Sequence, residues 1–250
     1  MSASAFGPLA VIVDPRAGGG RVGAEMPSLR RELDALGLEH ALWVADGPAD
    51  ATRRTRAALD EGYRYLVAVG GDGTVQDVVN GMFRDGEAIA DDLVLGVVAA
   101  HSGCDLVRSF GLPGDVVAAT RHLVGENTYP LDLVRIVSTG AGGERIVRYS
   151  HNLAEVGLGA AAVRGATRLP SWVGRARRFV GFWLAVAQTK VTQVRIDADR
   201  RTYEGPAFNV VVANAQFSSG GMRLSPRSFP GDGILDALVF QGPRSDAYTM

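Results

Sequence analysis

The 250-residue chain is long enough for one large domain or two small ones, and its composition, 46% apolar and 21% charged, is ordinary for a globular protein. A formal net charge of −1 argues against a nucleic-acid-binding protein, which normally carries a strong basic excess. The single cysteine, Cys104, excludes an internal disulfide framework and indicates a reducing compartment, so we expect a cytoplasmic protein. No apolar stretch approaches the roughly 20 residues needed to span a bilayer, which leaves peripheral contact with the inner membrane surface open.

Strands and helices alternate through the first half of the chain. Short apolar runs predict strands at residues 9–13, 38–44, 66–70 and 93–100. Helical patterns lie between and after them, at residues 22–36, 49–61, 74–83, 105–110 and 116–124. This alternation predicts a parallel sheet covered on both faces, which is a Rossmann-like α/β domain.

From Tyr129 onward the pattern changes to strands separated by Gly, Pro and Asp turns. Strands without helices between them predict an antiparallel β-sandwich. We therefore expect an α/β domain at residues 1–127 and a β-sandwich domain at residues 128–250, with a substrate in the cleft between them.

The most informative stretch is the strand that ends at Gly70 and the helix that follows it. Three glycines, Gly70, Gly71 and Gly73, let the backbone turn tightly and approach a ligand closely. The start of the next helix, which Thr74 can cap, directs N–H groups and a positive dipole end at the turn. The sequence therefore predicts a phosphate site. A carboxylate at Asp72 beside phosphate implies an intervening Mg²⁺ ion.

The run Gly70-Gly71-Asp72-Gly73-Thr74 resembles the nucleotide-binding signature of the diacylglycerol kinase-like lipid kinases, which include the sphingosine kinases. Similar stretches follow in the family's order along nearly the whole chain. They are Asp14-Pro15-Arg16-Ala17-Gly18, Leu95 to Arg108, Tyr129 to Leu133, and Asn209 to Phe240 with Asn214, Gly220-Gly221-Met222, Pro226 and Asp232-Gly233.

The resemblance implies transfer of the γ-phosphoryl group of ATP to a lipid hydroxyl, of a diacylglycerol-like or sphingoid kind, with Mg²⁺. Asp72 and Asp105 would organise the metal and its waters. The nucleotide would contact Asp14, Pro15, Gly18, Gly70, Gly71, Asp72, Gly73, Thr74, Ser102 and Gly103. Asp232 resembles a structural metal position of the bacterial enzymes, although Asp-Gly is also a common hairpin turn.

The sequence departs from the family near the nucleotide. His101, Ser102 and Cys104 replace a glycine, a threonine and an asparagine, Ala99 replaces a proline, and Ala45 stands where a threonine is frequent. The Asp-Gly-Glu segment that supplies the catalytic base in bacterial members does not follow Asp232-Gly233. We expect either that the chain is truncated at its C-terminus or that Asp72 is the base, as the resemblance to sphingosine kinases implies. Asp85-Gly86-Glu87 has the letters but lies in the wrong part of the fold.

Three other functions stay open. A catalytically impaired relative that binds nucleotide or lipid would explain the departures at Ala45, His101 and Cys104. Gly18 to Gly23 fits the letters of a dinucleotide-binding motif and hence an oxidoreductase, but four residues separate it from the strand. His101, Cys104 and Asp105 could form a nucleophilic site, although a small buried thiol is the simpler interpretation.

A stretch rich in arginine and aromatic residues interrupts the second half, between Ala161 and Lys190. It is either a helix packed on a sheet or a surface that meets lipid headgroups and acyl chains. A homodimer also stays open. The residues for membrane contact would be Trp172, Arg175, Arg178, Phe179, Phe182 and Trp183.

Overall fold

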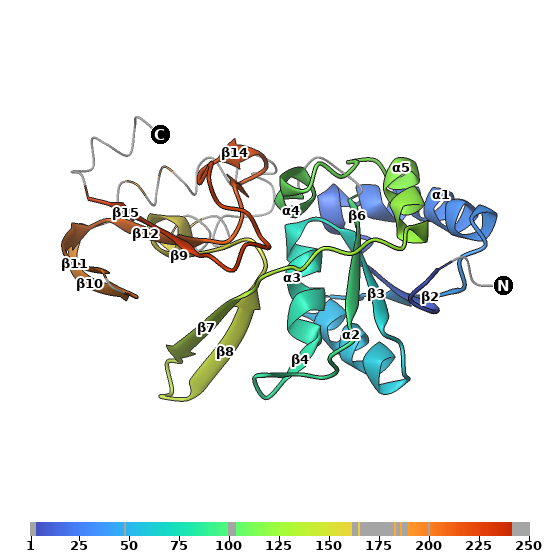
Figure 1. The fold of residues 1–250 in the computed structure, drawn as a ribbon, viewed down its shortest axis with the longest axis horizontal. Helices are drawn as coiled ribbons and strands as arrows, with labels where there is room; N and C mark the ends of the chain where they lie inside the picture. The colour runs from blue at the N-terminus through green and yellow to red at the C-terminus, as the bar shows by residue number, and fades with distance from the viewer. Residues whose placement is uncertain are drawn as a thin grey trace. The chain divides into compact units, whose positions relative to one another are not determined.

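The computed structural model describes residues 4–47, 49–99, 104–161, 165, 183, 186, 190–199 and 201–241. The chain forms two compact units (Figure 1). The first unit combines Met1–Asn152 with Asn214–Ile234, and the second combines Leu153–Ala213 with Leu235–Met250. Among the described residues, none of the helices has the length and apolarity that a membrane crossing requires.

The first unit is built on a four-stranded parallel sheet in the order β2-β1-β3-β6. The strands are β1 (Leu9–Val13), β2 (His40–Val44), β3 (Tyr65–Gly70) and β6 (Val94–Ala99). Every residue of β1 and β3 is buried, as expected for central strands covered on both faces.

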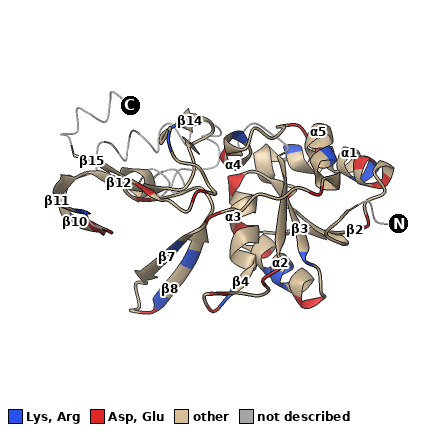
Figure 2. Ribbon diagram, in the orientation of Figure 1, with Lys and Arg blue, Asp and Glu red and all other residues tan. Residues whose placement is uncertain are grey.

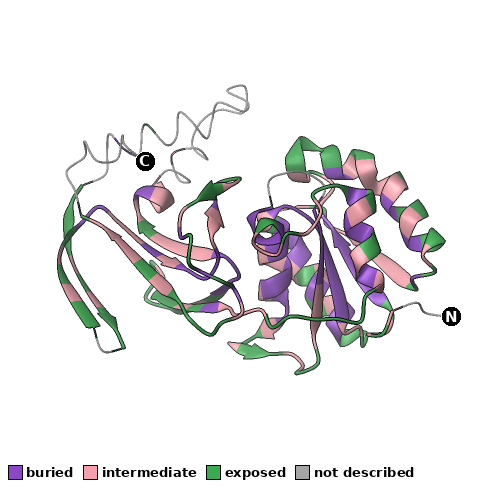
Figure 3. Cartoon of the chain, turned by 45° about the horizontal axis from the view of Figure 1, so that its top comes forward, coloured by how far each residue is buried: buried purple, intermediate pink, exposed green. Residues whose placement is uncertain are grey.

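Helices lie on both faces of this sheet (Figures 1 and 3). The α-helices are α1 (Arg21–Ala35), α2 (Asp50–Asp60), α3 (Asp72–Gly81), α4 (Asp105–Ser109) and α5 (Val116–Arg121), with short 3₁₀ turns at Ala17–Gly19 and His122–Val124.

Alternation along the strands divides the core into two clusters. Ala10, Ile12 and Leu66 point to one face and pack with α2, α3 and α4. Leu9, Val11 and Val67 point to the other face and pack with α1 and α5. The period-two pattern of the strands and the 3.6-residue period of the helices therefore account for the layered α/β arrangement.

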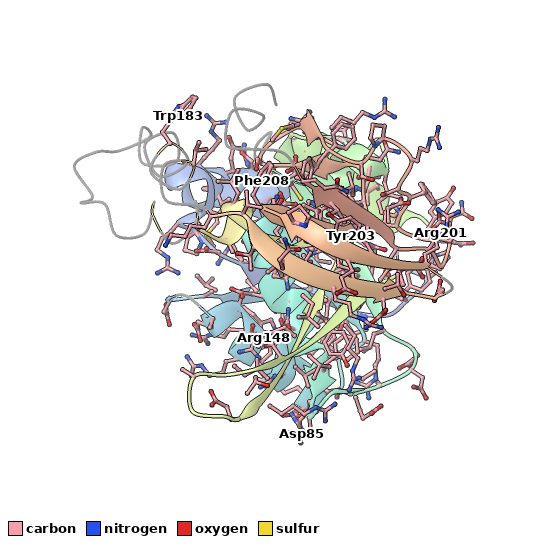
Figure 4. All side chains as sticks on the ribbon, turned by 90° about the vertical axis from the view of Figure 1, so that its left-hand side faces the viewer. Asp85, Arg148, Trp183, Arg201, Tyr203 and Phe208 are labelled. Carbon is pink, nitrogen blue, oxygen red and sulfur yellow. The ribbon has the colours of Figure 1, made fainter. Side chains whose placement is uncertain are left out.

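Three short hairpins complete the first unit. They are β4 (Phe83–Arg84) with β5 (Glu87–Ala88), β7 (Val134–Thr139) with β8 (Arg145–Ser150), and β13 (Phe217–Ser218) with β14 (Met222–Arg223). Asp85 and Gly86, with φ of 54° and 89°, form the two-residue turn of the first hairpin (Figure 4). Asp85-Gly86-Glu87 is thus a turn of the kind that Asp-Gly favours.

The second unit is antiparallel. Its three-stranded sheet has the order β15-β12-β9, formed by β15 (Asp236–Phe240), β12 (Asn209–Ala213) and β9 (Leu153–Gly157). A hairpin of β10 (Thr192–Ala198) and β11 (Arg201–Ala207) accompanies it. Phe208, labelled in Figure 4, packs with Leu158, Val186 and Phe240 in a small cluster.

The predicted fold class, a parallel α/β domain followed by antiparallel β structure, is confirmed. The two compact units are not separated at a single point of the sequence, because residues 214–234 pack with the first unit. The domain boundary after residue 127 stays a prediction.

Candidate active site: the start of helix α3

Helix α3 begins at Asp72, directly after β3 and the N-cap residue Gly71. Thr74 therefore lies inside the first turn, and the prediction that it caps the helix is wrong. Its buried side chain instead turns back toward the strand, where a Cβ on Gly70 would lie 2.2 Å from Thr74 Oγ1. Gly70 is required because any side chain there would collide with Thr74.

The first turn of α3 is free to bind an anion. The backbone N–H groups of Asp72 and Gly73 have no recorded acceptor within the part of the chain that the structure describes. A Cβ on Gly73 would meet no heavy atom within 4 Å, so open space adjoins these donors. Free N–H groups at the positive end of a helix, with room in front of them, fit a phosphate group.

The loop after β1 is organised differently from a dinucleotide-binding turn. Seven residues, 14–20, separate Val13 from the start of α1, and Gly18, Gly19 and Gly20 all have φ between 64° and 90°. Asp14 Oδ1 accepts hydrogen bonds from the backbone N–H (3.1 Å) and Nε (3.3 Å) of Arg16. Pro15 O accepts a bond from the N–H of Gly23. The predicted contacts of Asp14, Pro15 and Gly18 with nucleotide stay predictions.

The Asp72 carboxylate caps helix α4, which lies 33 residues further along the chain. Its Oδ1 and Oδ2 lie 2.8 and 2.9 Å from the backbone N of Asp105, and Oδ1 lies 3.3 Å from the N of Leu106. Burial alone would raise the pKa of Asp72, but the neighbouring His151 ring and hydrogen bonds from the N–H groups of Asp105 and Leu106 bring it below its ordinary value. Asp72 is therefore held as a carboxylate.

Asp105 opens helix α4 and is buried, with 2% of its side chain exposed. Its Oδ2 accepts a hydrogen bond from the N–H of Gly220 at 2.9 Å, in the turn between β13 and β14. Its Oδ1 has no hydrogen-bond partner among the described residues, and the nearest cation is Arg108 Nε at 3.7 Å. Burial and the charge of Asp72 raise the pKa of Asp105. The hydrogen bond from the Gly220 N–H lowers it, but by less than these two effects raise it. Acidic residues thus mark the first turns of both α3 and α4 (Figure 2).

Cys104, the N-cap residue of α4, is 1% exposed and its side chain makes no cap hydrogen bond. Burial, followed by the charge of Asp72, raises the pKa of the thiol to about 12. A thiol that stays protonated at neutral pH is a poor nucleophile, so the simpler interpretation of Cys104 as a buried packing residue is favoured.

Sequence reasoning missed three polar residues on helix α3 or beside it. His151 Nε2 lies 3.7 Å from Asp72 Oδ1, and His151 Nδ1 lies 3.1 Å from Oε1 of Gln76, one turn along α3. Asp77, also on α3, has a pKa raised by burial and by the charge of Asp14. No local motif marks His151, because its relation to Asp72 exists only in the folded chain. The sequence did offer a signal for Gln76 and Asp77, because both lie on the helix that follows the glycine turn.

Several predicted residues lie outside the described ones: Ser102, Gly103 and His101, and in the proposed membrane contact Trp172, Arg175, Arg178, Phe179 and Phe182. Trp183 is described and is 38% exposed (Figure 4). Asp232 Oδ1 accepts a hydrogen bond from the N–H of Ile234 at 2.9 Å, and Asp132 Oδ2 binds the N–H of Gly233. Asp232 thus closes a turn, and its metal role stays a prediction.

Comparison with known proteins gives consistent results. The profile of the family "Diacylglycerol kinase catalytic domain" matches residues 8–136, and that of the "YegS C-terminal NAD kinase beta sandwich-like domain" matches residues 152–248. A diacylglycerol kinase of Staphylococcus haemolyticus is 25% identical over 232 residues, which are 92% of this chain and 66% of the relative. One from Staphylococcus epidermidis is 26% identical over 232 residues, 92% of this chain and 69% of that protein.

A crystal structure of a diacylglycerol kinase from Bacillus anthracis has the same fold. Its TM-score is 0.71 at 21% sequence identity, covering 98% of this chain and 80% of that one. The chain spans about two thirds of the length of the Staphylococcus relatives. Because the first family profile covers more than half of the 250 residues, the chain belongs to the diacylglycerol kinase catalytic domain family, a family of lipid kinases whose catalytic domain implies the use of ATP.

Proposed function

We propose that this protein transfers the γ-phosphoryl group of ATP to the hydroxyl group of a lipid, of a diacylglycerol-like or sphingoid kind, in a Mg²⁺-dependent reaction. The observation that carries the proposal is the start of helix α3. Its first N–H groups are free among the described residues, open space adjoins Gly73, and two carboxylates, Asp72 and Asp105, lie beside it.

The residues present fit a hydrated cation. Asp105 Oδ1 is buried and has no hydrogen-bond partner among the described residues, although a buried carboxylate oxygen normally has one. Asp105 would hold Mg²⁺ through its Oδ1 and through water molecules. Asp72, whose carboxylate accepts the backbone N–H of Asp105, would support it. When bound, the ion would neutralise negative charge on the phosphates. The chain's own contribution is to position the phosphates with the N–H groups of Asp72 and Gly73.

The contacts of Asp72 favour a charge-organising role over the role of catalytic base. Both of its oxygens already accept backbone hydrogen bonds, and its lowered pKa makes it a weak proton acceptor at neutral pH. The hydroxyl proton of the lipid would therefore pass to another group.

The alternative, a relative that binds nucleotide without transferring phosphoryl groups, is favoured by Ala45 and Cys104. Both side chains are buried in the apolar core cluster, so neither offers a polar group to a nucleotide.

The test uses the protein from the complete reading frame with [γ-³²P]ATP, Mg²⁺ and mixed micelles that contain diacylglycerol or a sphingoid base. We expect label in the lipid fraction and loss of transfer in Asp72→Asn. MgATP binding by calorimetry without transfer to any lipid or polyol alcohol would contradict the kinase proposal and support the non-catalytic relative. Contact with a membrane surface stays a proposal, which vesicle sedimentation would test.

A further inference from the structure

Helix α3 is joined to strand β8 by side-chain amides. Asn80 Nδ2 donates to the carbonyl oxygen of Tyr149 at 2.8 Å, and Asn80 Oδ1 accepts from the N–H of the same residue at 3.0 Å. Gln76 Nε2 also donates to the Tyr149 carbonyl oxygen. Stacking of Phe83 on the Tyr149 ring, with centroids 3.7 Å apart, strengthens the contact. These contacts fix the chain that leads into His151.

The orientation of the Gln76 amide requires a hydrogen on Nδ1 of His151. Because Gln76 Nε2 donates to Tyr149, its Oε1 is left to accept a bond from His151 Nδ1 at 3.1 Å. His151 Nδ1 is therefore a donor. The backbone of His151 is held in turn, since its carbonyl oxygen accepts a bond from Asn214 Nδ2 at 2.9 Å.

The other ring nitrogen of His151 is directed at Asp72. Nε2 lies 3.7 Å from Asp72 Oδ1, and it has no hydrogen-bond partner among the described residues. The ring is 2% exposed, so water does not compete for this nitrogen. Because Nδ1–H is already donated to the Gln76 amide oxygen, Nε2 can donate to the Asp72 carboxylate only when both ring nitrogens carry hydrogen, and the ring is then held between the two acceptors.

Asp72 is thus contacted from two sides. The N–H groups of Asp105 and Leu106 bind it from α4, and the His151 ring contacts it from the chain after β8. Movement of the carboxylate would shift both the start of α3, of which Asp72 is the first residue, and the start of α4.

We propose that His151, oriented by Gln76, is a positioning residue that fixes the Asp72 carboxylate, and through it the starts of helices α3 and α4, for phosphoryl transfer. This inference rests on the proposed kinase function. His151 touches neither the phosphates nor the lipid in this account, so its loss lowers kcat and leaves the KM for the lipid unchanged.

The kinetic test compares His151→Phe, which keeps a planar ring without hydrogen bonds, with His151→Gln, whose amide can still donate to Asp72. His122→Phe is the matched control, since His122 is a partly buried histidine in the 3₁₀ turn after α5. We expect kcat to fall about 10- to 100-fold in His151→Phe, as for partners that orient a metal-site ligand, to recover in His151→Gln, and to be unchanged in His122→Phe.

Combining His151→Phe with Asp72→Asn separates positioning from general destabilisation. Because Asp72→Asn transfers no phosphoryl group, this comparison uses the free energy of urea unfolding. If His151 acts through Asp72, adding His151→Phe to Asp72→Asn costs less stability than adding it to the wild-type protein. A wild-type kcat in His151→Phe, or the same loss of unfolding free energy in both backgrounds, would overturn the proposal.

A second readout does not depend on turnover. The chain has four histidines, so long-range ¹H–¹⁵N NMR can resolve their ring nitrogens. Asp72→Asn should shift the Nε2 resonance of His151 and leave those of His122 in place. An unchanged His151 signal overturns the inference whether or not the protein is a kinase. If the wild-type protein transfers no phosphoryl group, the proposed function fails, and the NMR shift alone decides whether His151 fixes Asp72.

Discussion

The carboxylate of Asp72, the first residue of helix α3, accepts the backbone N–H of Asp105, the first residue of helix α4, with both oxygens, at 2.8 and 2.9 Å. One acidic side chain thus ties together the starts of two helices that follow neighbouring strands of the sheet, β3 and β6. Asp105 extends the connection to the β13–β14 turn through the N–H of Gly220. The predicted catalytic carboxylates therefore also stabilise the fold around the site.

Two replacements of Asp72 separate its role in catalysis from its role in stabilising the fold. Asp72→Ala removes the group that caps α4 and should lower the free energy of unfolding by about 1–2 kcal/mol, a typical value for a lost N-cap. Asp72→Asn keeps an oxygen acceptor and should cost less than that. Both should abolish phosphoryl transfer because both remove the charge. Urea unfolding and the transfer assay check the pair, and a stable Asp72→Asn variant with wild-type turnover would refute the role of the carboxylate.

The glycines at the start of α3 should respond to the same change in opposite ways. In Gly70→Ala the new Cβ would lie 2.2 Å from Thr74 Oγ1 and 2.7 Å from Thr74 Cβ, so we expect a loss of stability of about 1–3 kcal/mol. In Gly73→Ala the methyl group meets nothing within 4 Å, and alanine in place of glycine in a helix stabilises it by about 0.5–1 kcal/mol.

Gly73→Ala should nevertheless weaken MgATP binding, because the methyl group occupies the space in front of the free N–H groups. Thermal unfolding and calorimetry distinguish the two effects. Unchanged nucleotide affinity in the stable Gly73→Ala variant would place the phosphates elsewhere.

Asp50, the first residue of α2, should make stability depend on pH in the acid range. Its Oδ2 accepts the N–H of Asp46 at 2.8 Å, and Arg53 and Arg54 bind its carboxylate. The Asp46 N–H is the largest contribution, and it acts with both arginines to lower the pKa of Asp50 from 3.8 to about 2 despite burial. The folded pKa is below the unfolded one, so the stabilisation is fully present above about pH 4 and is lost as pH falls through 2.

Asp50→Asn should therefore be less stable than wild type at pH 7, and the difference should disappear near pH 2. Urea unfolding at several pH values provides the measurement. A difference between the two proteins that is constant from pH 7 to pH 2 would show that the Asp50 charge is not the cause.

Cys104 should be inert in the folded protein. Its thiol is 1% exposed, and burial with the charge of Asp72 raises its pKa to about 12. An aromatic disulfide reagent at pH 8 should therefore modify Cys104 only as fast as the region opens, and urea should accelerate the reaction to that of a free thiol. Rapid modification of the native protein would show that the thiol is reactive and would revive the nucleophilic interpretation.

The sequence predicted those features whose cause is local. Periodicity was sufficient to find β1, β3 and α3, and Gly70, Gly71 and Gly73 marked the turn between strand and helix. The helix begins three residues earlier than a Thr74 cap requires, because Thr74 packs back over Gly70 instead. Helix ends are decided by such individual contacts, which composition does not reveal.

The contacts that complete the candidate site are between distant segments. Asp72 meets α4 across 33 residues, and His151 lies beside Asp72 only because Gln76 and Asn80 hold β8 against α3. Asn214 Nδ2, which binds the carbonyl oxygens of Asp132 and His151, brings residues 214–234 back to the first unit. A single sequence carries no pattern for these pairings, which is why His151 was not among the predicted site residues.

The central claim is that the phosphates of ATP bind at the start of α3, and a crystal structure with magnesium and a non-hydrolysable ATP analogue tests it most directly. The account predicts a phosphate oxygen within hydrogen-bond distance of the backbone N–H of Asp72 or Gly73, with the metal on the side of Asp105. Nucleotide bound away from these residues, or no nucleotide at a saturating concentration, would contradict it.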